Sequence, residues 1–226
     1  MRIRRPSPWR TIATTLIVAI AAAGAARAAP VIADSQADFS GVQGQNGWYY
    51  GYFTEIGNDS TFTQLIHYIS DSSTTSNPHW RISTFFQPYT YLWSYGGHPQ
   101  GPNTTVRRWA STVAGAVLLT GHIADADING GNGIVANIYL DGTPLLTWEG
   151  SGTDSIGIDF SIPLTLGIGS VLDFEIADKG DYLFDSTYFY ATISAVPLPP
   201  GILLLGSAAA CLAGLRRRPS AAPAIA

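Results

Sequence analysis

Cysteine and charge are both scarce in this chain of 226 residues. A single cysteine excludes an intramolecular disulfide framework and a cysteine-rich zinc site. Asp, Glu, Lys and Arg make up only 12% of the residues, about half the usual share in a soluble domain. The apolar content of 46%, with 24 glycines and 14 prolines, excludes a disordered acidic protein, a coiled coil and a polytopic membrane protein.

Basic residues are almost absent from the middle of the chain. Residues 29–195 contain four of the twelve basic residues and all sixteen acidic ones, which leaves this stretch with a net charge of −12. Such a body repels nucleic acid and anionic lipid. We therefore expect no nucleic-acid partner, and a protein suited to neutral sugars or divalent cations.

Residues 1–28 have the organisation of a secretory signal peptide. Four arginines precede an uncharged apolar run over 12–26, and Ala26 and Ala28 supply the small residues at positions −3 and −1 of a cleavage site. A retained membrane anchor is the alternative, but the run is short for a membrane span. We expect export through the general secretion machinery and removal of this segment.

Residues 196–226 combine three features in order. The proline-rich segment VPLPPG is followed by the apolar run 202–215 and then by three arginines. Prolines prevent a helix from continuing through the first segment, the run is marginal for a hydrocarbon core of about 30 Å, and arginines stay on the cytoplasmic side. A buried core helix, the alternative, does not explain this order. The residues concerned are Val196, Pro197, Leu198, Pro199 and Pro200, then Arg216, Arg217 and Arg218.

This ordered tail resembles a PEP-CTERM sorting tail, and more narrowly its VPLPA-type variant, although Leu198 and Pro200 depart from the two motifs. The resemblance implies an exported protein of a Gram-negative bacterium that makes exopolysaccharide. It also implies an exosortase, a membrane protease, that cuts near the proline-rich segment. Cys211 would leave with the tail. The implied location is the inner membrane before processing, then the cell surface or matrix; no activity is implied.

Residues 29–195 show a period of two rather than 3.6, which is typical of half-buried strands. Asp141-Gly142 supplies the positive φ angles of a two-residue hairpin. We expect eight to ten short strands in an all-β antiparallel sandwich, jelly-roll-like, flanked by the signal helix and a C-terminal transmembrane helix; an up-and-down barrel is the alternative. The body is also similar to extracellular jelly-roll domains found with such tails, on QGQNGWYYGYF (43–53), RRW (107–109), GGNG (130–133) and GDYLFDST (180–187). The expected strands lie at 48–53, 62–69, 80–84, 106–109, 116–124, 134–140, 144–148, 156–162, 172–176 and 189–193.

Aromatic residues are the first candidate for a binding site. Sugars stack their C–H faces on exposed rings, so an outward aromatic row would form a glycan platform, with polar side chains setting the orientation. The alternative is that the rings fill the core. Arginine is rare in the body, so an arginine on the same strand face as a tryptophan is a further candidate, with a structural ion pair as its alternative role. The candidates are Trp48, Tyr50, Trp93, Arg107 and Trp109.

Calcium is the one cofactor that the sequence suggests. Asp125, Asp127 and Asn129 alternate in a D-x-D-x-N-G segment that looks like the first half of an EF-hand loop, but position twelve is Ala136 instead of Glu. A calcium-binding loop and a solvated turn between strands are the two interpretations. Asp178, Asp181 and Asp185 form a second acidic loop, which we interpret as a solvated surface segment with a shared cation as the alternative.

The sequence contains no HExxH, GxSxG or phosphate-binding glycine loop. We therefore expect a non-enzymatic surface or matrix protein that is associated with exopolysaccharide. A lectin-like carbohydrate-binding module is an alternative, and it requires an exposed aromatic row. A hydrolase that acts on the polysaccharide is another, and it requires two carboxyl groups that face each other in a cleft.

Overall fold

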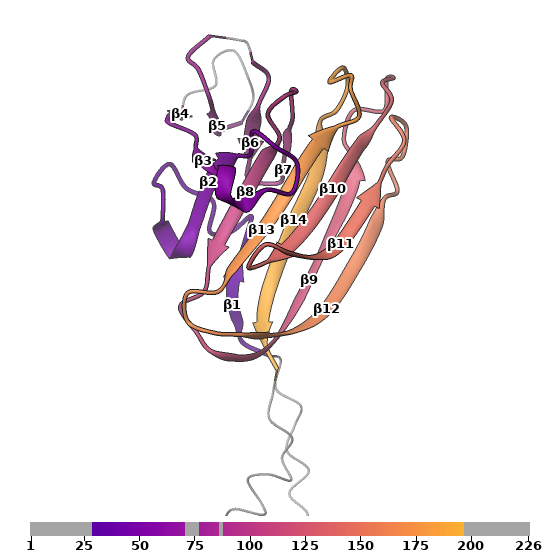
Figure 1. Cartoon of the computed structure of the whole chain (residues 1–226). Helices are drawn as coiled ribbons and strands as arrows, with labels where there is room; N and C mark the ends of the chain where they lie inside the picture. Colours follow the sequence, from indigo (N-terminus) through magenta and orange to yellow (C-terminus); the bar gives the residue numbers. More distant parts are fainter. Residues whose placement is uncertain (1–28, 71–76, 86–87, 197–226) are drawn as a thin grey trace, which may run out of the picture. The chain divides into compact units, whose positions relative to one another are not determined.

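The computed structural model describes residues 29–70, 77–85 and 88–196, and this part of the chain is a two-sheet antiparallel sandwich (Figure 1). These described residues belong to one compact unit. The predicted signal peptide with Ala26 and Ala28, and the sorting tail from Pro197 through Arg216–Arg218, lie outside the described residues. Within the described residues, no helix has the length and apolar character that a membrane crossing needs.

The larger sheet, sheet A, contains eight strands, and the smaller one, sheet B, contains six. Two single-turn 3₁₀ helices, η1 (Gln45–Gly47) and η2 (Asp59–Thr61), lie in the loops beside β2. In sheet A the order is β12 (Ile158–Leu166), β9 (Gly115–Asp125), β14 (Thr187–Ala195), β7 (Gly96–His98), β6 (Tyr91–Trp93), β5 (His79–Arg81) and β4 (His67–Ile69), and β1 (Val31–Asp34) also pairs with β14. In sheet B it is β11 (Thr143–Glu149), β10 (Ile134–Leu140), β13 (Val171–Asp178), β8 (Thr105–Ala110), β2 (Trp48–Tyr52) and β3 (Thr63–Gln64).

The predicted sandwich is confirmed, because the strands form two separate sheets instead of the alternative barrel. The number of strands is larger than predicted: the described residues contain fourteen. The excess comes from short strands such as β1, β6 and β7, and from the run 62–69, which divides between the two sheets as β3 and β4. Asp141 and Gly142 have φ values of 49° and 75°, so the predicted hairpin turn between β10 and β11 is confirmed.

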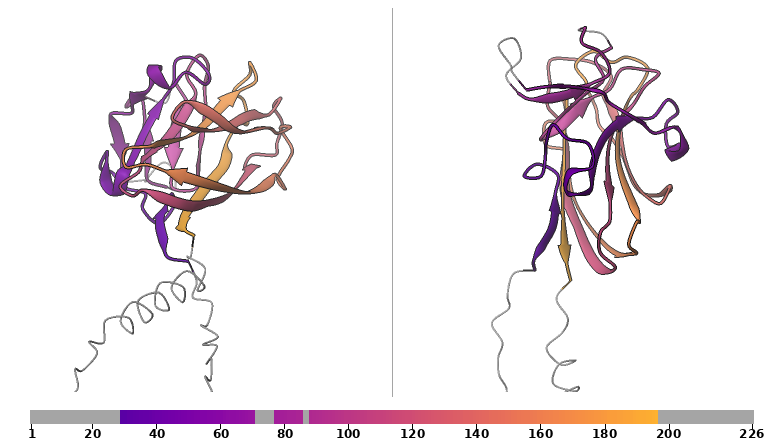
Figure 2. Two further views of the ribbon diagram at one scale, coloured as in Figure 1. Left: turned by 60° about the horizontal axis from the view of Figure 1, so that its bottom comes forward. Right: turned by 90° about the vertical axis from the view of Figure 1, so that its left-hand side faces the viewer.

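The core lies between the sheets and is rich in aromatic rings. Alternate residues of each strand point inward, as the pleat requires. The inward faces of β9, β13 and β14 carry Leu119, Phe174 and Phe189, which belong to one buried cluster. The first and last described strands lie side by side in sheet A, where Ala33 pairs with Ile193 (Figure 2). A complete core with paired terminal strands is what an independently folding domain requires.

Candidate functional site

Three of the predicted ligand-binding aromatics belong to the core. Trp48, Tyr50 and Trp109 are at most 1% exposed, because these positions of β2 and β8 point between the sheets. They are therefore closed to a glycan. Of the two interpretations that the sequence left open for these rings, their burial supports the one in which they fill the core, because alternation alone does not decide which face of β2 is inward.

Arg107 is also buried, at 3% exposure, and it shares the inward face of β8 with Trp109 as the alternation predicts. Its Nη1 donates to the carbonyl oxygen of Ser35 at 3.2 Å, and its Nη2 donates to that of Trp93. Burial lowers the pKa of Arg107 to about 10, so the guanidinium is charged at neutral pH. Its role is structural, and its partners are main-chain carbonyl groups rather than the carboxylate of an ion pair.

Trp93 is the candidate that lies on a surface. Its neighbour in β6, Leu92, points into the core, so Trp93 points to the outer face of sheet A. There it stacks on Tyr95, with ring centroids 6.0 Å apart and planes within 2° of parallel. Successive contacts between rings, with centroids 5.6–5.9 Å apart, extend this pair in both directions. The resulting aromatic row consists, in spatial order, of Tyr182, Tyr89, Tyr91, Trp93, Tyr95 and Tyr188.

A shallow hollow lies at the β14 end of the aromatic row. Its volume is about 400 Å³, and Tyr188, which is 42% exposed, lies in its wall. His122 also lies there: its ring stacks on Tyr190 at 5.6 Å, and its Nδ1 lies 2.7 Å from Asp159 Oδ1. This first hollow is lined by Gln36, Tyr95, His122, Ser155, Tyr188 and Tyr190.

A second hollow, of about 320 Å³, lies at the opposite end of the row. Its wall includes the exposed ring of Phe184, whose φ of 66° is unusual for a bulky residue. His98 Nδ1 lies 3.0 Å from the carbonyl oxygen of Tyr89, and burial lowers the pKa of the His98 ring. This hollow is lined by Tyr89, His98, Asp127, Tyr182, Leu183 and Phe184.

Trp93 is the member of the aromatic row among the ligand-binding candidates given above, and the sequence carries a signal for three of its neighbours. Aromatic residues occupy every second position from Tyr89 to Tyr95, which places four rings on one face if the segment is extended. Tyr188 and Tyr190 likewise alternate with the inward Phe189. The contribution of Tyr182 has no local signal, because only the fold brings the β13–β14 loop to β6.

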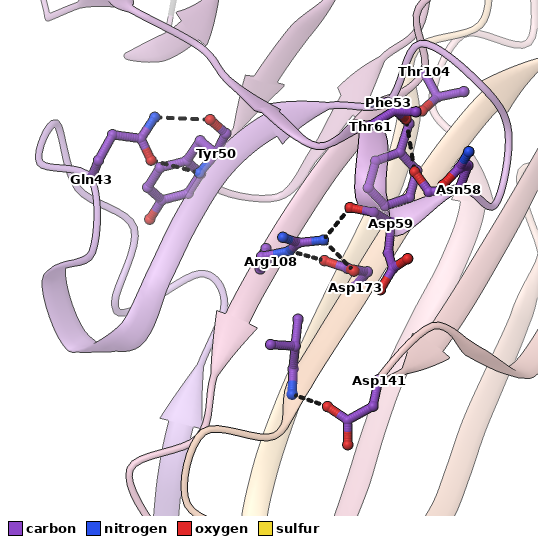
Figure 3. A network of polar contacts seen from close by, with 11 residues as sticks. Gln43, Tyr50, Phe53, Asn58, Asp59, Thr61, Thr104, Arg108, Asp141 and Asp173 are labelled. Carbon is purple, nitrogen blue, oxygen red and sulfur yellow. Dashed lines mark hydrogen bonds and ion pairs between the residues drawn. The ribbon is translucent and has the colours of Figure 1, made fainter.

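The outer face of sheet B carries a polar network that is covered by residues 53–64 (Figure 3). Arg108 pairs with Asp173 through two hydrogen bonds of 2.7 and 2.9 Å, and its guanidinium lies 3.9 Å from the ring centroid of Phe62. Burial raises the pKa of Asp173, and Arg108 opposes this effect. Asp173 and Glu175 lie on one face of β13, but both are buried and hydrogen-bonded. They do not face each other across an open cleft.

The D-x-D-x-N segment forms the turn after β9. Asp125 Oδ1 accepts from the Asp127 N–H at 2.8 Å, and Asp127 Oδ1 accepts from the Asn129 amide at 2.5 Å. Asp125 is buried while Asn129 is exposed, so the three side chains do not share one environment. Among the described residues, no three His, Cys, Asp or Glu side chains are gathered as a metal site.

The second acidic loop is only partly a surface segment. Asp185 is 1% exposed, contrary to the interpretation of all three residues as solvated. Burial, with repulsion from Asp178, Asp181 and Asp125, raises the pKa of Asp185 to about 8. Burial also raises the pKa of Asp125, so each of the two acidic segments contains one buried aspartate.

The fold defines the class of the domain as a two-sheet antiparallel β-sandwich, and the comparisons add likenesses of fold only. No family model and no curated protein matches the chain. A solved structure of the M60 catalytic domain of Clostridium perfringens ZmpB with its two CBM51 domains has a TM-score of 0.36 and 12% identity; the match covers 47% of this chain and 11% of that one. A CBM51 from Clostridium perfringens GH95, in complex with methyl-galactose, has a TM-score of 0.33 and 13% identity over 48% of this chain and 76% of that one.

A family 35 carbohydrate binding module from Clostridium thermocellum is also similar, with a TM-score of 0.30 and 13% identity over 59% of this chain and 85% of that one. These values describe a partial likeness between sandwiches. One fold serves many ligands, so the function has to be argued from the side chains of this chain.

Proposed function

We propose that this domain is a non-enzymatic carbohydrate-binding module that holds a neutral polysaccharide on the outer face of sheet A. The aromatic row carries this proposal. It offers a line of rings in mutual contact, with a hollow of about 400 Å³ at one end and one of about 320 Å³ at the other. Apolar walls with a few convergent polar groups are typical of small-ligand sites.

Polar groups in the first hollow provide the orientation that ring stacking alone lacks. His122 Nδ1 lies 2.7 Å from Asp159 Oδ1, which leaves Nε2 of that ring to hydrogen-bond a sugar hydroxyl. Tyr95 and Tyr190, which each carry a phenolic hydroxyl, line the same hollow. Burial raises the pKa of Tyr95, so its hydroxyl is protonated and able to donate at neutral pH.

Charge favours a neutral ligand. No lysine or arginine is present among the described residues that line either hollow. The body carries a net charge of −12 between residues 29 and 195, so a polyanion would be repelled before it reached the row. Neutral glycans have no such barrier.

Tyr188→Ala and Tyr95→Ala are expected to weaken binding of a neutral polysaccharide by at least about tenfold, because each removes a ring from the wall of the first hollow. The measurement is isothermal titration calorimetry of the purified protein against a panel of soluble neutral glucans, galactans and xylans, with alginate as the anionic comparison.

Tyr49→Ala is the matched control. Tyr49 is half-buried, as Tyr95 is, but it pairs with Arg108 on the outer face of sheet B. We expect its substitution to leave the affinity unchanged. Saturable binding that survives both substitutions would place the glycan elsewhere, and the failure of every neutral polysaccharide to bind would refute the proposal.

We also propose that the domain is delivered to the cell surface or matrix by its sorting tail, through an exosortase. The support is the order of features in residues 196–226. The sandwich extends to the first residue of the proline-rich segment, since the Val196 N–H still donates to the carbonyl oxygen of Ala116 at 3.2 Å. A cut just after this point would release the whole sandwich.

Deletion of residues 197–200 is expected to leave the protein at its unprocessed size and in the membrane fraction. The measurement is an immunoblot of a body-tagged chain in an exosortase-containing host, with and without the deletion. A chain that lacks only residues 219–226, which follow the arginines, is the control and should be processed normally. Unchanged size and release after the first deletion would show that the segment has no role in sorting.

A further inference from the structure

β9 and β14 lie side by side in sheet A (Figure 1), and two carboxylates are buried where the end of β9 pairs with the start of β14. Asp125 is the last residue of β9 and pairs with Thr187, the first residue of β14; Asp185 lies two residues earlier. The Ala126 N–H donates to the carbonyl oxygen of Ser186 at 2.7 Å, so the two chain segments remain in contact there. Asp125 is 5% exposed and Asp185 is 1% exposed.

The oxygens of this pair are largely unused. Within the described part of the chain, Asp125 Oδ2 and both carboxylate oxygens of Asp185 are buried and have no hydrogen-bond partner. Buried polar atoms are nearly always satisfied, and a buried carboxylate without a partner is costly. Lys179, in the same loop as Asp185, pairs with Glu149 at 3.5 Å instead. A positively charged group without a bulky side chain would offset the free-energy cost of burying these carboxylate oxygens.

A glycine loop closes over the pair and brings in main-chain oxygen. Gly131 has a φ of +80°, and a Cβ on it would lie 2.3 Å from the carbonyl oxygen of Leu183 and 3.6 Å from Asp185 Oδ1. Only glycine therefore permits this close approach. The carbonyl oxygen of Leu183 and Asp185 Oδ1 therefore lie on the same side of the glycine loop, both close to the position that a Cβ of residue 131 would occupy.

We propose that Asp125, Asp185 and the carbonyl oxygen of Leu183 bind a calcium ion at this end of the sandwich. Calcium takes six to eight oxygen ligands and accepts carboxylates, main-chain carbonyls and water in flexible geometry. The set contains only hard oxygen donors, which suits calcium rather than zinc. This ligand set differs from the one that the sequence suggested. Asp125 is common to both, but Asp185 and the Leu183 carbonyl oxygen, from the β13–β14 loop, take the places of Asp127 and Asn129.

The ion would connect β9 to the loop that carries Tyr182 and Phe184, so calcium should stabilise the fold itself. After treatment with a chelator, the purified protein is expected to show a rise in Tm of about 5–10 °C when calcium is added at about a hundredfold excess over its Kd. Calorimetry should give saturable calcium binding. Both measurements are made without sugar, so failure of the glycan proposal leaves this test intact.

Asp185→Asn and Asp125→Asn should abolish the calcium response in both measurements. Glu55→Gln, which changes an exposed carboxylate in the loop over sheet B, is the control and should retain it. Asp185→Asn relieves repulsion among the acids, so it should fold without calcium. A wild-type Tm that calcium leaves unchanged would overturn the site and assign the pair to a buried protonated contact. A calcium response that survives both substitutions would overturn the ligand assignment.

Discussion

Arg107→Ala is expected to lower the free energy of unfolding by about 4 kcal/mol. The guanidinium donates to the main-chain oxygens of Ser35 and Trp93 inside the sandwich, and alanine would remove both of these hydrogen bonds. Each unsatisfied buried acceptor costs about 1–3 kcal/mol, and the loss of a buried side chain adds a cavity. Chemical denaturation followed by tryptophan fluorescence measures the change. Because the free energy of unfolding of a domain is usually about 5–15 kcal/mol, the variant would be only marginally stable.

The topology explains why these two carbonyl groups matter. β14 pairs with β9 along one side, but its other side is shared: β7 pairs at Thr187 and Tyr188, and β1 pairs from Thr192 to Ser194. Ser35 spans part of the interval, exchanging two hydrogen bonds with Ala191. Arg107 reaches from sheet B and connects the segment that follows β1 to the end of β6. Arg107 thereby stabilises the part of sheet A between Tyr188 and Thr192, where one side of β14 has no strand partner.

Arg107→Lys and Arg81→Ala separate this explanation from a general effect of losing an arginine. An ammonium group lacks the planar fork that reaches two acceptors, so lysine should retain roughly half of the stabilisation. Arg81 is half-buried and donates to the carbonyl oxygen of Thr84 and to the Tyr91 side chain, so its loss should cost about 1–2 kcal/mol. If Arg107→Ala costs as little as Arg81→Ala, the two carbonyl groups have another donor and this part of sheet A is held by other contacts.

The positions of many strands could be predicted from the sequence, but which face of each strand points into the core could not. Alternation identified β10, β13 and β14, and Asp141-Gly142 identified the hairpin, because both signals are local. Alternation also placed Arg107 and Trp109 on one face, but no local rule says that this face is inward. An arginine in a core opposes the usual distribution of charge. Its partners are main-chain oxygens, which a side-chain pattern does not encode.

The candidate sites divide in the same way. The rings from Tyr89 to Tyr95 alternate in the sequence, so one face of the aromatic row could be predicted from residue types alone. Tyr182 and Tyr188 join it through the β13–β14 loop and the pairing of β14 with β7, which are long-range features. Asp185 looked like a solvated acid for the same reason: its burial arises from a glycine loop some fifty residues earlier in the chain, at Gly131.

Glu175→Ala is also expected to lower the free energy of unfolding by about 4 kcal/mol. In this variant the protein loses a buried hydrogen-bond acceptor, whereas Arg107→Ala removes a donor. Glu175 Oε2 accepts from Asn137 Nδ2 and from the Tyr139 hydroxyl, both at 3.0 Å, and its Oε1 accepts from the Gly57 N–H at 3.2 Å. Burial, and then the Glu175 charge, raise the pKa of Tyr139, so the hydroxyl stays a donor throughout the accessible pH range.

Alanine at position 175 would leave those three donors unsatisfied beneath residues 53–64, each at a cost of about 1–3 kcal/mol. Glu175→Gln is the matched control: it keeps the shape and one oxygen, and the Tyr139 hydroxyl can rotate to accept from the new amide, so about half of the loss should be recovered. The measurement is the denaturation midpoint of both variants, with amide hydrogen exchange at Gly57. Exchange at Gly57 should rise most in the alanine variant, because that N–H loses its acceptor. Equal destabilisation by alanine and glutamine would show that the negative charge, and not the number of accepted hydrogen bonds, holds this loop on sheet B.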